Sequence, residues 1–303
     1  MNYLITGGAG FIGSHLASSL SANKNNKIWI IDLSKQIKKI KKIKRIVYIS
    51  GDISKPEVFQ KVKSKIDIAY HLAAQTSNQV GEEQPILNYK SNILGTQNFY
   101  SWALENKPSK CFFTSSMAVY GQDCQNKKAN SICEPHSNYG ISKLTGELIF
   151  KMLGKHNIKY TIFRLFNVYG PGQDLSNLKQ GMLSIYISQA LKSNIINITG
   201  SLDRIRDFIY IDDVISLLTS KKIKDNTIYN IGLGKIIKVE KAIKLIQKYF
   251  KKNFIIKIKK NSAGDIVKSY ANIDKLKSIN FKFKFDLQKG IKKTLNNYFN
   301  ISE

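Results

Sequence analysis

A short apolar run followed at once by regularly spaced glycines opens the chain, and it limits the fold more than any other feature. Residues 3–5 read as a strand, and Gly7, Gly10 and Gly13 follow with the spacing Gly-x-x-Gly-x-x-Gly. The missing side chains permit a tight turn, close approach of a pyrophosphate to backbone N–H groups, and close packing of a helix on the strand. The stretch predicts a strand, a glycine turn and a helix in direct succession.

A second predicted strand supports this interpretation because it ends in an acidic residue. The strand predicted at 27–32 is apolar over 28–31 and ends in Asp32, which lies about twenty residues after the glycines, as in dinucleotide-binding units. The Asp32 carboxylate can bind both ribose hydroxyls of an adenosine and would repel a 2′-phosphate. The sequence therefore favours NAD over NADP as the cofactor.

The chain then alternates between strand-like and helix-like segments. We expect strands at 45–49, 67–71, 110–114 and 159–165, with helices at 55–65 and 85–106 between them. This alternation predicts an α/β fold with a Rossmann-type, doubly wound parallel sheet. Asp52 lies just past a strand end, where such sheets bind ligands, and could accept a hydrogen bond from the adenine amino group.

Composition indicates a globular cytoplasmic protein. Of the 303 residues, 43% are hydrophobic, and no apolar run reaches the about 18 residues that a membrane span needs. The first residues form a strand pattern instead of a signal sequence, so we expect no membrane association. Three cysteines are too few for a disulfide framework and indicate reduced thiols. Cys124, Cys133 and His136 match no common zinc spacing, so no metal is expected.

The formal charge of +27 suggests anionic partners such as nucleic acid, acidic lipid or phosphorylated small molecules. Lysine is nevertheless spread over the whole length, often beside isoleucine and asparagine, as in 37–44 and 255–260. The sequence has no arginine-rich arm and no strand with paired stacking aromatics. We interpret the lysine runs as solvated faces and do not expect nucleic-acid binding.

A tyrosine and a lysine four residues apart supply the candidate chemistry. On a helix, Tyr139 and Lys143 share one face, and the ammonium would stabilise a phenolate and move its pKa toward the range of a general base. Ser116 follows the strand predicted at 110–114 and can hydrogen-bond a substrate oxygen. His15 and His71 are interpreted as packing and structural residues.

Together these motifs resemble extended short-chain dehydrogenases/reductases, specifically NAD-dependent nucleotide-sugar epimerases similar to UDP-glucose 4-epimerases. The resemblance rests on TGGAGFIGSHL (6–16), GDI (51–53), HLAAQ (71–75), SSMAVYG (115–121), YGISK (139–143), RLFNVYGPGQ (164–173) and RDFIYIDDV (206–214). It implies reversible oxidation of a UDP-hexose to a 4-keto sugar by a bound NAD.

The resemblance also implies site residues. Ser116, Tyr139 and Lys143 would be catalytic, and Ser116, Asn167, Arg206 and Ser269 would contact the sugar nucleotide, with Asn167 and Arg206 at its diphosphate. The cofactor would lie against Gly7, Gly10, Phe11, Ile12, Gly13, Asp32, Asp52, Ile53, Leu72, Ala73, Ala74, Asn92, Tyr139, Lys143 and Phe166.

Two departures from the family pattern bear on the substrate. Met117 and Ala118 stand where related 4,6-dehydratases carry an Asp-Glu pair, which disfavours dehydration. Ser262 replaces an arginine of the family's Arg-x-Gly-Asp segment, and Ser269 replaces a gatekeeper that is often a bulky tyrosine. The small Ser269 predicts that UDP-N-acetylglucosamine is accepted as well.

The resemblance further suggests two domains and a dimer. We expect an NAD-binding domain over 1–166, with return segments around 207–233, and a smaller α+β substrate domain over 167–303. A homodimer would form through the helix at 85–106 and the helix carrying Tyr139. A reductase, a decarboxylase or an epimerase acting at another carbon would keep every motif, and a non-catalytic RNA-binding relative would explain the charge. A redox-sensing module that only binds NAD is the third alternative.

Overall fold

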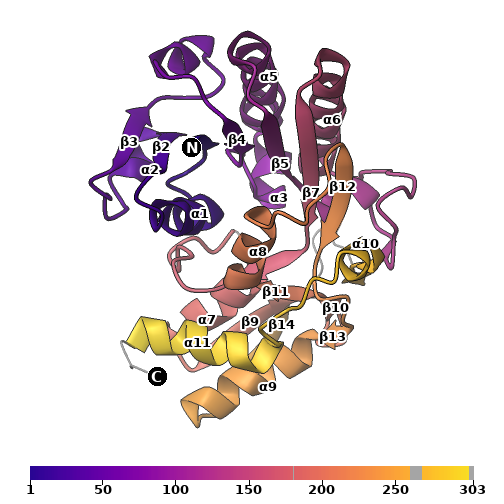
Figure 1. The fold of residues 1–303 in the computed structure, drawn as a ribbon. Helices are drawn as coiled ribbons and strands as arrows, with labels where there is room; N and C mark the ends of the chain where they lie inside the picture. The colour runs from indigo at the N-terminus through magenta and orange to yellow at the C-terminus, as the bar shows by residue number, and fades with distance from the viewer. Residues whose placement is uncertain (180, 260–267, 300–303) are drawn as a thin grey trace.

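A parallel sheet of seven strands forms the centre of the molecule (Figure 1). The computed structural model describes residues 1–179, 181–259 and 268–299. Across the sheet the order is β12 (Thr227–Ile231), β7 (Lys159–Leu165), β5 (Lys110–Ser116), β4 (Ile68–His71), β1 (Asn2–Thr6), β2 (Lys27–Asp32) and β3 (Ile46–Ser50). Every neighbouring pair is parallel. The predicted doubly wound Rossmann fold is confirmed.

Successive side chains of the strands enter two different cores. In β1, Tyr3 and Ile5 belong to one cluster of buried residues, and Leu4 belongs to the other. In β2, Ile30 and Ile31 divide in the same way. Successive residues of a strand point to opposite faces, so the sheet is buried on both sides, as expected for a parallel sheet.

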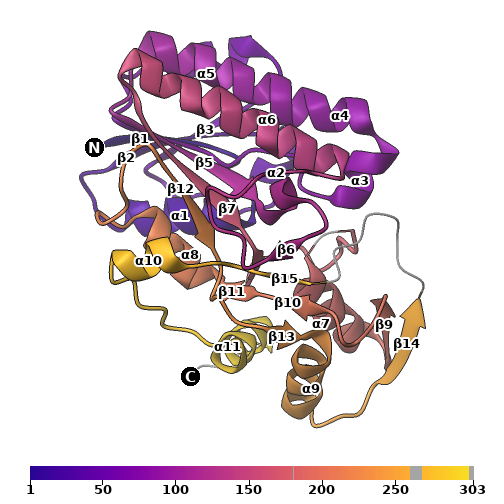
Figure 2. The same ribbon diagram turned by 90° about the vertical axis from the view of Figure 1, so that its right-hand side faces the viewer.

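Helices cover both faces of the sheet (Figures 1 and 2). Helices α1 (Phe11–Ser21) and α8 (Ile211–Leu218) pack together on one face, and α5 (Gly95–Asn106) and α6 (Asn138–Met152) pack together on the other. This placement brings the N-terminus of α1 and the first turn of α6 to the same edge of the sheet, at the carboxyl ends of its strands.

Two expected helices differ in the structure. The helix at 85–106 divides into α4 (Pro85–Tyr89), a π-helical turn η2 (Lys90–Leu94) and α5. The helix at 55–65 shortens to the 3₁₀ helix η1 (Pro56–Lys61), and Val62 after it is extended. Only Val58 and Phe59 anchor η1 in the core. After η1, Val62 and Ile66 are buried in the same core, so the apolar spacing continues, but the alternate lysines Lys61, Lys63 and Lys65 repel one another.

The rest of the chain lies below the sheet in short strand pairs and helices (Figure 2). The pairs are β8 (Asn167–Tyr169) with β11 (Phe208–Tyr210), β9 (Ile195–Thr199) with β14 (Ile255–Lys259), β10 (Ile205–Arg206) with β13 (Ile237–Lys238), and β6 (Cys124–Gln125) with β15 (Ser269–Tyr270). The helices are α7 (Met182–Lys192), α9 (Val239–Phe250), α10 (Asp274–Ser278) and α11 (Leu287–Phe299). The domain boundary at residues 166 and 167 stays a prediction.

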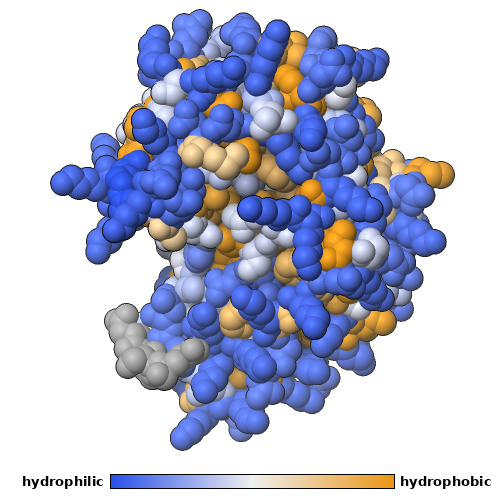
Figure 3. All heavy atoms as spheres, viewed as in Figure 1, coloured by the Kyte–Doolittle hydropathy of each residue, from blue (hydrophilic) through white to orange (hydrophobic). Residues whose placement is uncertain are grey.

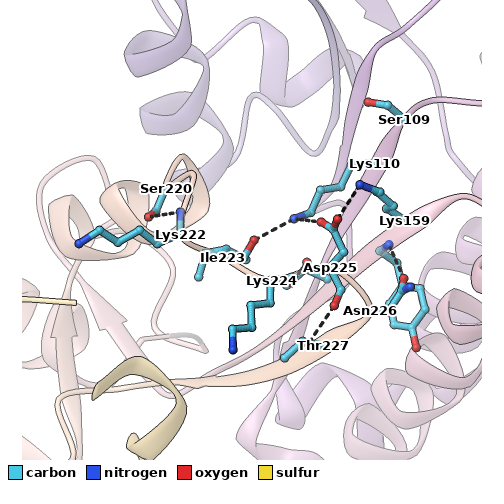
Figure 4. Close-up of polar contacts among 12 residues, drawn as sticks. Ser109, Lys110, Lys159, Ser220, Lys222, Ile223, Lys224, Asp225, Asn226 and Thr227 are labelled. Atoms are coloured by element: carbon cyan, nitrogen blue, oxygen red, sulfur yellow. Dashed lines mark hydrogen bonds and ion pairs between the residues drawn. The ribbon is translucent and has the colours of Figure 1, made fainter. Parts of the chain in front are cut away.

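A carboxylate bound by two lysines fastens the edge strand β12 to the sheet (Figure 4). Asp225, just before β12, lies 2.7 Å from Lys110 Nζ and 2.9 Å from Lys159 Nζ, through its two oxygens. Lys110 and Lys159 begin β5 and β7. The contact therefore joins three strands at the end of the sheet opposite the glycine turn.

Hydrophilic side chains cover most of the face shown in Figure 3, with apolar residues scattered among them. Within the described residues, no helix combines the length and the apolar character that a membrane crossing requires.

Candidate active site

A cavity of about 1070 Å³ lies at the carboxyl ends of the sheet strands and extends toward the strand pairs below. This volume is at the upper end of the range for ligand pockets, which reaches about 1,000 Å³. The residues expected from the sequence that line it are Gly7, Gly10, Phe11, Ile12, Gly13, Asp32, Asp52, Ile53, Leu72, Ala73, Ala74, Ser116, Tyr139, Lys143, Phe166 and Asn167. Residues far apart in the sequence thus face one space.

The glycine turn has no room for side chains. Gly7 adopts a φ of +73°, and a Cβ there would lie 2.6 Å from Ala73 N. A Cβ on Gly13 would lie 2.1 Å from Gly7 O. Gly10, directly before α1, is more open, because its Cβ would approach only Gly7 O, at 3.3 Å. The turn leaves the N-terminus of α1 facing the cavity, where backbone N–H groups suit a pyrophosphate.

Two acidic residues line the cavity beyond the turn. Asp32 Oδ2 accepts a hydrogen bond from Ala9 N at 2.9 Å, and Oδ1 accepts one from Leu33 N at 2.7 Å. Burial raises the pKa of Asp32, and the backbone hydrogen bonds partly offset this effect. Asp52 is exposed and accepts a hydrogen bond from Ser54 N at 2.9 Å. Each carboxylate oxygen can accept a further hydrogen bond, so the geometry fits an adenosine. The turn and Asp32 together fit a bound NAD.

Tyr139 and Lys143 lie on the first turns of α6, which Ser137 caps by accepting a hydrogen bond from Gly140 N at 3.0 Å. Burial raises the pKa of Tyr139 to about 12, although a hydrogen bond with Ser116 lowers it. Burial also lowers the pKa of Lys143 to about 7. Ser116 Oγ itself accepts a hydrogen bond from Ala118 N at 3.2 Å. The structure therefore brings the three expected catalytic side chains to one wall of the cavity.

The expected lowering of the Tyr139 pKa by Lys143 is not found in the structure. We expected the ammonium to lower the pKa of the phenol, but the pKa of Tyr139 is raised. Desolvation penalises both charged forms, and the Lys143 ammonium lies over the Phe113 ring, 4.4 Å from its centroid. Burial raises the pKa of Tyr139 by more than the hydrogen bond with Ser116 lowers it.

Asn92 does not line the cavity, and its expected contact with the cofactor stays a prediction. It lies in the π-helical turn η2 and is only 2% exposed. Its Nδ2 donates to Gln75 O at 2.9 Å and to Ser142 Oγ at 2.9 Å, and its Oδ1 accepts from Gln75 N at 2.7 Å. Both polar atoms of the Asn92 amide are hydrogen-bonded to protein groups. Asn92 therefore links the loop after β4 to the helix α6.

The expected diphosphate and sugar residues divide between the cavity and the interior. Asn167 lines the cavity and donates from Nδ2 to Asp207 O at 3.1 Å. Arg206 is 3% exposed and lies outside the lining, with Nη1 donating to Ile205 O at 2.8 Å. Ser269 is fully buried in β15 opposite Cys124, and among the described residues its Oγ has no hydrogen-bond partner. Ser262 lies outside the described residues.

The two histidines that we interpreted as structural have protein partners. His71 lies between Thr6 Oγ1, 2.7 Å from Nδ1, and Thr96 Oγ1, 3.0 Å from Nε2, and burial lowers its pKa to about 3. His15 Nδ1 is 2.9 Å from Phe11 O. Across the described ranges, no three His, Cys, Asp or Glu side chains come together as a metal site would require.

Sequence reasoning missed two groups of residues near the site. The segment from Asp174 to Lys179, just after the motif at 164–173, also lines the cavity, but its loop composition gave no signal. Glu147, on α6 itself, forms a buried ion pair with Arg164 of β7. The spacing of Tyr139, Lys143 and Glu147, each four residues after the previous one, could have predicted that the three side chains share a face of α6.

Comparisons with known proteins agree with this geometry. Residues 3–232 match the model of the NAD dependent epimerase/dehydratase family. A Methanocaldococcus jannaschii protein named "Putative UDP-glucose 4-epimerase" is 32% identical over 97% of both chains. UDP-glucuronic acid decarboxylase 6 of Arabidopsis thaliana is 28% identical, over 96% of this chain and 87% of its own. The structure of a Thermotoga maritima UDP-glucose 4-epimerase with UDP-glucose superposes with a TM-score of 0.90, at 28% identity, over 100% of both chains.

Proposed function

The chain belongs to the NAD dependent epimerase/dehydratase family, and from this premise we propose that it interconverts UDP-hexoses differing in configuration at carbon 4. The proposed pair is UDP-glucose and UDP-galactose, together with the N-acetylated counterparts. One observation carries the proposal: Ser116, Tyr139 and Lys143 face the same cavity as the glycine turn and Asp32. Similarity to the Thermotoga and Methanocaldococcus proteins supports the choice of reaction.

The proposed cofactor site uses residues of the sheet edge. The glycine turn would hold the pyrophosphate, Asp32 the adenosine ribose and Asp52 the adenine. When bound, NAD supplies a reversible acceptor for the electrons and the hydrogen taken from the sugar carbon. Net oxidation over the full reaction is zero, so we expect purified protein to retain its NAD.

In the proposed mechanism, Tyr139 as phenolate takes the proton of the 4-hydroxyl, and Ser116 hydrogen-bonds the same oxygen. Burial raises the pKa of the Tyr139 phenol, so ionisation near neutral pH needs positive charge beside it. Lys143, one helical turn away, is the cation that this chain provides. The keto sugar then rotates in the site and presents its other face for reduction. Tyr139 returns the proton to the oxygen, and the other epimer forms.

The sugar-nucleotide contacts are proposed for Asn167, Arg206 and Ser269. Asn167 already faces the cavity, whereas Arg206 would have to reorient toward it. A guanidinium offers the diphosphate a planar, bidentate partner. Met117 and Ala118 carry no carboxylate after Ser116, which argues against elimination of water as the reaction.

Product analysis tests the proposal. Purified protein is incubated without added NAD with UDP-glucose, UDP-galactose or either N-acetyl form, and the products are separated by chromatography. We expect the epimer of at least one substrate to appear, and replacement of Tyr139 by Phe to reduce kcat by at least about 100-fold while bound NAD is kept. Full activity of Tyr139→Phe would refute the mechanism. Loss of CO₂ from UDP-glucuronic acid would instead favour a decarboxylase, as its Arabidopsis relative suggests.

We also propose that two copies pair through α4, α5 and α6. Exposed apolar side chains gather on α4, at the end of η2 just before α5, and on α6, namely Ile86, Leu87, Leu94, Ile141, Leu148 and Met152, of which Leu87 also lines the cavity. On α6 their spacing defines one stripe, opposite the buried Lys143. Contiguous exposed apolar surface of this kind is typical of an interface. The proposed location is the cytoplasm, because the three cysteines are free thiols.

A further inference from the structure

A buried carboxylate on the catalytic helix is not used by the proposed reaction. Glu147 is fully buried on α6, one helical turn after Lys143. Its Oε1 accepts hydrogen bonds from Ser115 Oγ at 2.6 Å and from Arg164 Nε at 2.8 Å, and its Oε2 accepts one from Arg164 Nη2 at 2.7 Å. The pair is bidentate, and it joins α6 to the ends of β5 and β7.

The same arginine holds the segment that follows Ser116. Arg164 Nη1 donates to Tyr120 OH at 2.9 Å and to Ala129 O at 3.0 Å. Tyr120 OH in turn donates to Asn230 Oδ1 at 2.6 Å. Tyr120 ends the 3₁₀ turn η3 (Met117–Tyr120), which begins directly after Ser116. Hydrogen bonds thus fix the chain on both sides of Ser116, at Ser115 before it and at Tyr120 after it.

Resting on the function proposed above, we propose that Glu147 and Arg164 are positioning residues for the proton transfer. The ion pair fixes the position of Ser116 relative to Tyr139. The Glu147 carboxylate supplies the negative charge that keeps Lys143 protonated. Neither side chain lines the cavity, so both act through the residues that do.

The surroundings of Lys143 leave Glu147 as the group that favours its charge. Burial lowers the pKa of Lys143 to about 7, and the charge of Glu147 raises it. From β5, the Phe113 ring faces the ammonium; from β4, His71 stacks on that ring and stays neutral because burial lowers its pKa to about 3. On α6 itself, Tyr139 is a neutral phenol below its raised pKa. The Arg164 charge from β7 is bound directly to the carboxylate.

Packing alone does not require this pair. A buried ion pair contributes little net stability, because desolvation of both charges offsets their attraction. Two apolar side chains of similar size would fill the space as well. A charged pair at this place is explained by what it does to Lys143 and to the backbone around Ser116.

The first test is the pH dependence of Glu147→Gln, which removes the charge and keeps the shape. Loss of the negative charge lowers the pKa of Lys143, so Lys143 loses its proton at lower pH. We expect the basic limb of the pH profile of kcat to move down by about one pH unit, kcat at pH 8 to fall about tenfold, and KM to change less than about twofold.

Asp213→Asn is the matched control. Asp213 is also fully buried, and its oxygens accept backbone hydrogen bonds from Lys284 N at 2.9 Å and Phe285 N at 3.1 Å. It lies on α8, on the other face of the sheet. We expect this control to lower stability and to leave the pH profile in place, which separates positioning from a general loss of structure.

A measurement without substrate separates this proposal from the proposed reaction. The ¹³Cε resonance of Lys143, identified by its loss in Lys143→Met, is titrated by NMR in the wild type and in Glu147→Gln. If Glu147→Gln does not fold, the double variant Glu147→Gln/Arg164→Met removes both charges and leaves no unpaired one. A downward shift of the Lys143 titration supports the proposal even if no sugar is turned over. An unchanged titration in a folded variant overturns it, whichever reaction the protein catalyses.

Discussion

Two alanine substitutions three residues apart, at Gly10 and Gly13, can separate the packing role of the glycine turn from its role as a binding site. At Gly13 an added methyl group would lie 2.1 Å from Gly7 O and 2.7 Å from Gly8 Cα, both of which are backbone atoms. The close-packed turn would have to open by about 1 Å to accept it. At Gly10 the same methyl would meet only Gly7 O, at 3.3 Å, and would otherwise point into the cavity.

The two variants are therefore expected to fail in different ways. Overpacking of this kind costs about 1–3 kcal/mol, so Gly13→Ala should lower the free energy of unfolding of the NAD-free protein by that amount. Gly10→Ala should leave this free energy nearly unchanged, because its φ of −79° suits alanine. In the NAD complex, however, its methyl would stand between the backbone and the pyrophosphate. The same range of energies corresponds to a loss of about 5- to 150-fold in affinity for NAD.

The assay needs both quantities for each variant. Bound nucleotide is removed, unfolding in guanidinium chloride gives the stability of the free protein, and calorimetric titration gives the affinity for NAD. Wild-type affinity of a stable Gly10→Ala variant would contradict the placement of the pyrophosphate on the turn. Unchanged stability of NAD-free Gly13→Ala would contradict the close packing of α1 on the turn.

Three further predictions concern charge and substrate. Replacement of Lys143 by Met should raise the melting temperature most below pH 7 and progressively less toward pH 10. The reason is that burial lowers the pKa of Lys143 to about 7 in the folded protein, while in the unfolded chain this lysine stays protonated to a much higher pH. An increase in melting temperature that does not depend on pH would refute this. Asp225→Asn should cost about 1 kcal/mol of unfolding free energy at pH 7, since two lysines hold its carboxylate, whereas Asp203→Asn, which breaks one exposed pair with Lys238, should cost less than half as much. Both lysines lower the pKa of Asp225, so this difference between wild type and variant should disappear as the pH falls through that lowered pKa in acid unfolding curves. Ser269→Tyr should suppress turnover of UDP-N-acetylglucosamine more than that of UDP-glucose, and equal losses would remove Ser269 as the gatekeeper.

The elements that could be predicted from the sequence are those with a strong local pattern. Helix α9 has such a pattern, because Val239, Ala242, Ile243 and Ile246 form one apolar stripe. The strand at 27–32 and its acidic end were also predicted correctly. Local patterns failed at η1, where the apolar spacing of Val58, Val62 and Ile66 suits a longer helix but the chain is already extended at Val62.

The candidate site could be predicted where a residue faces the cavity from a strand end or a helix start. Ser116, Tyr139 and Asp32 belong to this class. The surroundings of Asn92 could not be predicted, because its partners Gln75 and Ser142 are distant in sequence and meet only when the helices pack. The ion pair between Glu147 and Arg164 forms in the same way only when α6 packs against β7.

If two copies pair through α6 as proposed, the two sides of this helix link dimer formation to catalytic turnover. One side carries Lys143 inward, and the other leaves Ile141 and Leu148 exposed, where the second copy is proposed to bind. A partner that covers the outer stripe would restrain the fraying of the same turns that hold the phenol and the ammonium. Specific activity should then decline on dilution below the dissociation constant of the dimer and recover on concentration. The amount of enzyme in the cell would in this way set its activity per molecule as well as its total activity.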